Sequence, residues 1–125
     1  MNALAIVLRY NAASCILFGH AFAIAPAWIS SLIGNSAPWV LRIVGLGLVF
    51  HGLHLLLASR RSRVVCPEVI YFILGDLGWV LATLVLLSLG IGITNSLGTV
   101  FALLIAALVG TLGFLQFRHA KKLCA

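Results

Sequence analysis

The chain has 125 residues, of which 63% are hydrophobic and only 8% are charged. A soluble domain carries about 25% charged residues, so this composition excludes a water-exposed surface over most of the molecule. The net charge of +6 comes from eight Lys and Arg residues against two acids. These bases lie at the ends of hydrophobic runs, which indicates membrane topology and gives no reason to expect a nucleic-acid function.

Four hydrophobic runs are long enough to cross a bilayer, because about 20 mostly apolar residues span its hydrocarbon layer of roughly 30 Å. They predict membrane-spanning helices over residues 3–25, 39–58, 67–89 and 97–117. We therefore expect an all-α fold, a four-transmembrane-helix bundle with up-down-up-down topology. The first run is preceded by no basic segment and is interrupted by Arg9, so we expect a retained helix and not a cleaved signal peptide.

The connections between these runs differ in charge. Residues 26–38 hold two prolines and Trp28, which is typical of an interfacial loop with aromatic anchors. Residues 59–66 and the C-terminal tail are basic, whereas residues 90–96 are uncharged. The positive-inside rule then places both termini and the basic loop in the cytoplasm, in a multi-pass protein of the bacterial inner membrane. The basic side chains expected to contact anionic lipid headgroups are Arg60, Arg61, Arg63, Lys121 and Lys122.

The three cysteines give a weak signal for any covalent or metal framework. Cys15, Cys66 and Cys124 are odd in number and contain no C-x-x-C pair. We expect Cys66 and Cys124 to be reduced thiols near the cytoplasmic interface. We also expect no bound metal and no cofactor.

Several polar residues fall inside the predicted spans, where a charged side chain needs a partner or a function. With a rise of about 1.5 Å per residue, they lie roughly 6 to 13 Å inside the membrane on its cytoplasmic side. Asp76 is the only acid well inside a span. It is either a proton- or cation-binding carboxylate, or the partner of Arg9 or of a histidine. The expected intramembrane polar cluster is Arg9, Asn11, His51, His54 and Asp76; His20 and Arg42 form a separate group nearer the outer surface.

His51 and His54 are three residues apart and lie on one helix face. They could share a metal, but zinc sites need three or four ligands and Asp76 alone is level with them. Either histidine could ligate haem or a pigment singly. The pattern favours a neutral, hydrogen-bonded pair within the bundle, with the alternative that His54 extends to the interface.

Small residues recur at helix-packing spacing in two of the runs. Such residues allow close approach of helix backbones, either inside one bundle or at the seam of an oligomer. The candidates are Gly45, Gly52, Ala106, Gly110 and Gly113.

Three segments carry a resemblance to known families. NAASCILFG (11–19), WVLRIVGLGL (39–48) and YFILGDLGWVL (71–81) are similar to small bacterial four-helix membrane proteins. VLRIVGLGLVFHGLHLLL (40–57) also resembles the first helix of DoxX-type membrane proteins, although here it is the second predicted helix. The resemblance implies a four-helix membrane fold and assigns no catalytic residues.

No catalytic set can be assembled from the sequence, which lacks paired carboxylates, a Ser/His/Asp set and a Gly-rich phosphate loop. We expect a non-enzymatic accessory or self-associating membrane subunit, partnered by the lipid bilayer and by a second copy or another membrane protein. One alternative is a proton-linked transporter of a small molecule or ion that uses the intramembrane polar cluster. A second alternative is a haem- or pigment-binding subunit.

Overall fold

The computed structural model describes residues 3–34, 37–61 and 64–124, and its regular elements are helices. They are α1 (Ala3–Ile24), α2 (Pro26–Ile33), α3 (Pro38–Arg60), α4 (Cys66–Leu89) and α5 (Ser96–Leu123). By length and composition, α1, α3, α4 and α5 can each cross a membrane. The predicted all-α membrane bundle with four spans is therefore confirmed.

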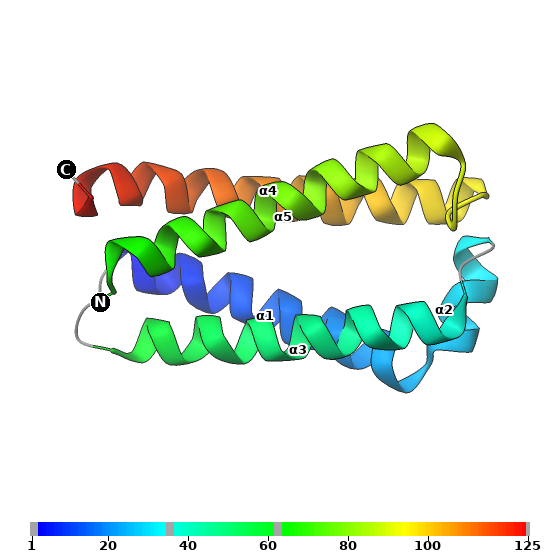
Figure 1. Cartoon of the computed structure of the whole chain (residues 1–125), viewed down its shortest axis with the longest axis horizontal. Helices are drawn as coiled ribbons and strands as arrows, with labels where there is room; N and C mark the ends of the chain where they lie inside the picture. The colour runs from blue at the N-terminus through cyan, green and yellow to red at the C-terminus, as the bar shows by residue number, and fades with distance from the viewer. Residues whose placement is uncertain (1–2, 35–36, 62–63, 125) are drawn as a thin grey trace.

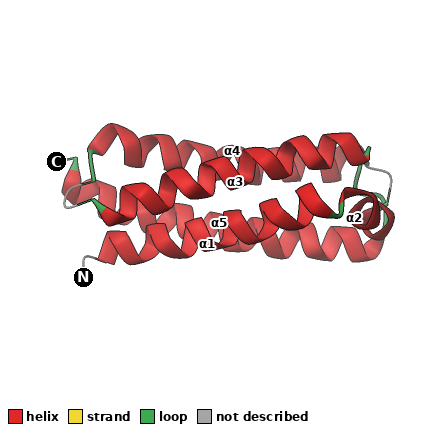
Figure 2. Cartoon of the chain, turned by 90° about the horizontal axis from the view of Figure 1, so that it is seen from below, coloured by secondary structure: helices red, strands yellow, loops and turns green. Residues whose placement is uncertain are grey.

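The four long helices run antiparallel in chain order. Figure 1 shows α1 and α4 running one way along the long axis and α3 and α5 running the other way. Both termini lie at one end, and the short helix α2 covers part of the opposite end (Figure 2). We call these the terminal end and the α2 end. The up-down-up-down topology is thus confirmed, while the side of the membrane that the terminal end faces stays a prediction.

The connection over residues 26–38, predicted as a loop, contains helix α2. Its two prolines lie at helix starts, because Pro26 begins α2 and Pro38 begins α3. Proline is tolerated in the first turn of a helix because that turn's N–H groups have no intrahelical partner. At the other end of the chain, α5 continues past residue 117 to Leu123. Lys121 and Lys122 lie in its last turn, where cations interact favourably with the helix dipole.

Helix α1 packs closely against α3 along a seam of small residues. A Cβ atom added at Gly45 would lie 2.6 Å from the backbone oxygen of Gly19, and one at Gly52 would lie 3.0 Å from that of Ala12. The two backbones are therefore in direct contact. Close approach of this kind holds helices together where lipid removes the hydrophobic drive between them.

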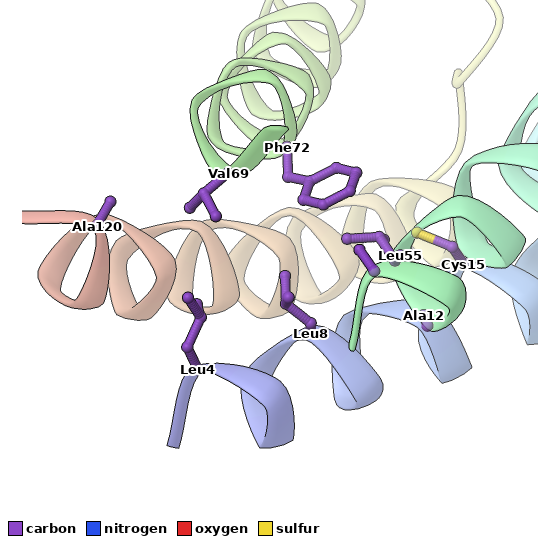
Figure 3. Close-up of a cluster of buried hydrophobic side chains, with 9 residues drawn as sticks. Leu4, Leu8, Ala12, Cys15, Leu55, Val69, Phe72 and Ala120 are labelled. Carbon is purple, nitrogen blue, oxygen red and sulfur yellow. The ribbon is translucent and has the colours of Figure 1, made fainter. Parts of the chain in front are cut away.

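The bundle consists of two helix pairs. Helix α1 packs on α3 and α4 packs on α5, and the pairs meet mainly through α1 and α5; within the described ranges no comparable backbone approach joins α3 to α4 (Figure 1). Side chains fill the space between the pairs near the terminal end. Figure 3 shows Leu8 of α1, Leu55 of α3 and Phe72 of α4 converging there, and each is fully buried. This apolar core joins all four spans.

The α2 end is closed by hydrogen bonds between the α4–α5 connection and the last residues of α2. The Thr94 backbone N–H donates to the Ile33 oxygen at 3.0 Å, and the Asn95 side-chain amide donates to the Leu32 oxygen at 2.8 Å. The Asn95 side-chain oxygen also accepts from the Gly98 N–H at 2.7 Å, which caps the start of α5. One side chain therefore begins a span and ties it to α2.

A disulfide closes the terminal end. Cys66, the first residue of α4, is bonded to Cys124, which directly follows α5, and their Cα atoms are 5.4 Å apart. The prediction of reduced thiols at these positions is wrong. Antiparallel packing brings the start of α4 beside the end of α5, and the separation of 58 residues in the sequence gave no sign of this register. Cys15 is buried and carries a free thiol.

Candidate functional site

The carboxylate of Asp76 lies inside the bundle, where three helices converge. The side chain is in the middle of α4, and the residue is 4% exposed. Asn11 of α1 donates from Nδ2 to its two oxygens at 3.0 and 3.3 Å. Gln116 of α5 donates from Nε2 to Oδ2 at 2.7 Å. These donors are neutral amides, where the sequence suggested Arg9 or a histidine; Arg9 is partly buried on α1.

Gln116 is a functional candidate that the sequence reasoning missed. Its side chain is fully buried, and Nε2 also approaches the Leu112 oxygen at 3.2 Å. Among the described residues, its Oε1 atom has no hydrogen-bond partner. The available signal was a lone amide in an apolar run, one turn after Gly113. That glycine makes the contact possible, because a Cβ atom there would lie 3.1 Å from the Cβ of Asp76.

A line of polar groups extends from Asp76 into α1. Asn11 is 1% exposed, and its Oδ1 accepts a weak hydrogen bond from the Cys15 thiol at 3.5 Å. Cys15, Asn11, Asp76 and Gln116 therefore form one connected set across α1, α4 and α5. The connections satisfy polar groups that would otherwise be costly away from water, with the exception of Gln116 Oε1. We call these four residues the Asp76 network.

A small cavity lies beside the Asp76 network. Its volume is about 50 Å³, and its polar lining comes from Ser14, His51 and Asp76. A water molecule needs roughly 10–15 Å³ by the same measure, so the cavity can hold a few waters. The remaining lining residues are Cys15, Phe18, Phe22, Leu48, Gly75, Trp79, Ile105 and Val109. All four spans thus line the space, and its polar groups lie on α1, α3 and α4.

His51 of α3 lines this cavity on the side of the bundle where the backbones of α3 and α4 do not approach closely. Its ring makes edge contacts with the rings of Tyr71 at 6.0 Å and Phe72 at 5.8 Å between centroids. The imidazole also lies against Gly75, since a Cβ atom there would be in ordinary van der Waals contact with His51 Cε1, at 3.5 Å. His51 and Asp76 therefore share one cavity, as their predicted depths required.

His54 belongs to a different group, nearer the terminal end. Its Nε2 lies 2.9 Å from Glu68 Oε2, and its side chain is 41% exposed. Arg61 donates from NH1 to both Glu68 oxygens at 2.9 Å. His54 packs against the rings of Tyr71 and Phe72, as His51 does, but Glu68 is its polar partner. This placement matches the alternative in which His54 extends toward the interface. Glu68 neutralises a basic patch here instead of joining Asp76.

The outer polar group bonds to the backbone of α1. His20 Nδ1 lies 2.8 Å from the Ile16 oxygen, and Arg42 donates from Nε to the Ala23 oxygen at 3.3 Å. The first contact lies within α1, and the second ties α3 to α1 near the α2 end. No described hydrogen bond connects His20 or Arg42 to the Asp76 network.

The remaining predicted residues have clear places. Gly45, Gly52 and Gly113 lie at contacts between helices, Ala106 is buried, and a Cβ atom at Gly110 would lie 3.6 Å from Val80 Cγ2. Arg60 and Lys122 are exposed, whereas Arg63 lies outside the described residues. Within residues 3–34, 37–61 and 64–124, no group of three or more His, Cys, Asp or Glu side chains is arranged to hold a metal ion.

Comparison of the sequence with protein-family models, with curated proteins and with solved structures gave no match. The resemblance to DoxX-type proteins therefore stays a prediction. The function has to be inferred from the chemistry of the Asp76 network and its cavity.

Proposed function

We propose that this protein is a proton-linked transporter of a small ion or polar molecule, with Asp76 as the proton-binding group. One observation carries the proposal: a buried carboxyl group within a span is held by neutral amides and borders a cavity. An ionisable residue in this position is costly, and it marks ion pathways and proton relays in membrane proteins.

Amide partners suit a carboxyl group that gains and loses a proton. The amide of Asn or Gln carries both N–H donors and a carbonyl acceptor, whereas Arg only donates. In the described arrangement Gln116 donates to Asp76, and its Oε1 lacks a donor. If Asp76 binds a proton, rotation of the Gln116 amide lets Oε1 accept the new O–H. Both charge states of Asp76 therefore find partners without movement of the helices.

The size and lining of the cavity favour a small transported species. Pockets for cofactors and metabolites measure about 300–1,000 Å³, against about 50 Å³ here. A haem ring has no room beside His51 in this conformation, which weakens the hypothesis of a haem carrier. Protons, small ions and water-sized solutes fit, with His51 and Ser14 able to bond them.

The small residues favour this proposal over a self-associating subunit. That hypothesis needed Gly45, Gly52 and Gly113 for contacts with another chain. All three instead contact neighbouring helices of the same chain. A non-enzymatic accessory role stays a prediction.

A flux experiment tests the proposal. The full chain is reconstituted into liposomes that enclose a pH-sensitive dye, and proton flux is driven by a potassium potential set with valinomycin. We expect flux above that of empty liposomes, lost in Asp76→Asn. Glu68→Gln is the matched control, because it removes the chain's other acidic side chain, which lies outside the cavity, and should retain the flux.

A second measurement, on the wild-type protein, tests the proposal if Asp76→Asn fails to fold. A membrane-soluble carbodiimide modifies carboxyl groups in the folded wild-type protein, and we expect flux to fall as Asp76 becomes labelled. Peptide mass mapping identifies the labelled residue. Flux that is unchanged in folded Asp76→Asn, or wild-type flux equal to that of empty liposomes under both pH and potential gradients, would contradict the proposal.

A further inference from the structure

A second concave surface lies between α4 and α5 at the terminal end, away from the Asp76 network. Its volume is about 340 Å³, several times that of the cavity beside Asp76. We call it the α4–α5 groove. Its walls are Ile70, Ile73 and Leu74 of α4, Phe117, Ala120 and Lys121 of α5, and Cys124, which directly follows α5. Since α4 and α5 both span the membrane, the groove opens toward lipid.

The groove is amphipathic along its length. Lys121 and Cys124 lie at the interface end, whereas Phe117 lies one helical turn deeper on α5. Lys121 Nζ is 4.9 Å from the centre of the Phe117 ring. The ammonium group of Lys121 therefore lies over the aromatic ring inside the groove, in a cation–π contact. The groove is thus cationic at the interface end and apolar deeper in the membrane, which is also the order of headgroup and acyl chain in an anionic lipid.

Within the described part of the chain, neither acidic side chain pairs with Lys121. The sequence contains two acids. Glu68 is engaged by His54 and Arg61, and Asp76 is engaged by amides inside the bundle. Lys121 is therefore available to pair with an anion from outside the chain, and it is the cation that lines the groove.

We propose that the α4–α5 groove binds one anionic phospholipid, with the phosphate on Lys121 and an acyl chain against Leu74 and Phe117. The charge order of the groove matches that of the lipid, and its walls are apolar. Ala120, which is 6% exposed, forms the floor and leaves width for a chain. The Cys66–Cys124 disulfide joins the two helices at the mouth and holds the walls together. This inference does not depend on the transport proposal.

Native mass spectrometry of the detergent-purified full chain tests this site. The protein is equilibrated in mixed micelles with phosphatidylglycerol or with phosphatidylcholine of the same acyl chains. We expect the wild type to retain one phosphatidylglycerol molecule in preference to phosphatidylcholine. Lys121→Ala should lower that preference about five-fold, since a lysine near an anionic surface contributes about 1 kcal/mol. Lys122→Ala is the matched control and should keep it, because Lys122 does not line the groove.

A second pair of variants tests the apolar wall without changing charge. Leu74→Trp fills the groove and should remove the retained lipid. Leu77→Trp places the same side chain on an exposed position of α4 outside the groove and should retain it. Equal retention of the two lipids by the wild type, equal losses in Lys121→Ala and Lys122→Ala, or retention unchanged in Leu74→Trp would each overturn the proposal.

Discussion

Gln116 Nε2 lies 2.7 Å from Asp76 Oδ2, and this hydrogen bond joins α5 to α4 inside the membrane. Gln116 is fully buried and Asp76 nearly so. Away from water, a polar group without a partner is costly, so each of these side chains depends on the other. The bond therefore stabilises the pairing of the two helices and fixes the position of the proposed proton-binding group.

Replacing Gln116 by leucine removes one of the two amide donors to Asp76. We expect Gln116→Leu to lower the free energy of unfolding by about 1 kcal/mol, which is typical of hydrogen bonds between membrane helices. Unfolding in mixed micelles with rising SDS content measures the change. Thr111→Val on the same helix is the control and should have little effect, because Thr111 is exposed and bonds only its own helix. A Gln116→Leu protein as stable as the wild type would contradict this role.

The seam between α1 and α3 should not tolerate side chains larger than hydrogen. At Gly45 a Cβ atom would meet the Gly19 oxygen at 2.6 Å. We expect Gly45→Val to lower the free energy of unfolding by about 1–3 kcal/mol or more, because overpacking forces the backbones apart. Gly47→Val is the control on the same helix, since a Cβ atom at Gly47 would meet nothing within 4 Å. Equal losses in the two variants would show that helix propensity, and not packing, explains the effect.

The features that composition and charge determine were predictable from the sequence. Length and hydropathy predicted four spans, and the rise per residue placed Asn11 and Asp76 at similar depth, where the structure joins them. Depth alone cannot give the rotation of each helix about its axis. For that reason the sequence predicts Arg9 or a histidine as the partner of Asp76. It does not identify Gln116, which is uncharged and lies at the edge of a predicted span.

Contacts that depend on the register of neighbouring helices were not predictable. The disulfide requires α4 and α5 to end level with each other, and neither Cys66 nor Cys124 carries that information in its local sequence. Helix α2 was missed for a related reason. Proline marks a break in a helix and also favours its first turn, and only the surrounding structure decides between the two.

Asn95 should contribute to stability through two separate hydrogen bonds. Asn95→Ala removes the cap of α5 and the bond to the Leu32 oxygen, and we expect a loss of about 1–2 kcal/mol in the free energy of unfolding. Asn95→Asp keeps the capping oxygen and loses the donor to Leu32. It should therefore show a smaller loss, and a loss as large as that of alanine would mean that the link to α2 dominates.

The disulfide should also stabilise the fold. Cys124→Ser opens a loop of 58 residues and, by the chain-entropy relation, should lower the free energy of unfolding by up to about 4 kcal/mol. Unfolding of wild type and variant under non-reducing conditions measures the difference. Cys15→Ala is the control, because its thiol is free and its removal leaves the closed loop intact.

The same disulfide tests the orientation of the protein in the membrane. The basic loop and tail predict that the terminal end faces the cytoplasm, where glutathione and thioredoxin keep thiols reduced. The structure instead contains the Cys66–Cys124 disulfide, which predicts a single thiol, that of Cys15, when intact cells are alkylated and the protein is denatured. A Cys15→Ala variant should then show none. One thiol would mean that this end faces an oxidising compartment and that the orientation inferred from the positive charges is reversed, whereas three thiols would support that orientation and contradict the disulfide.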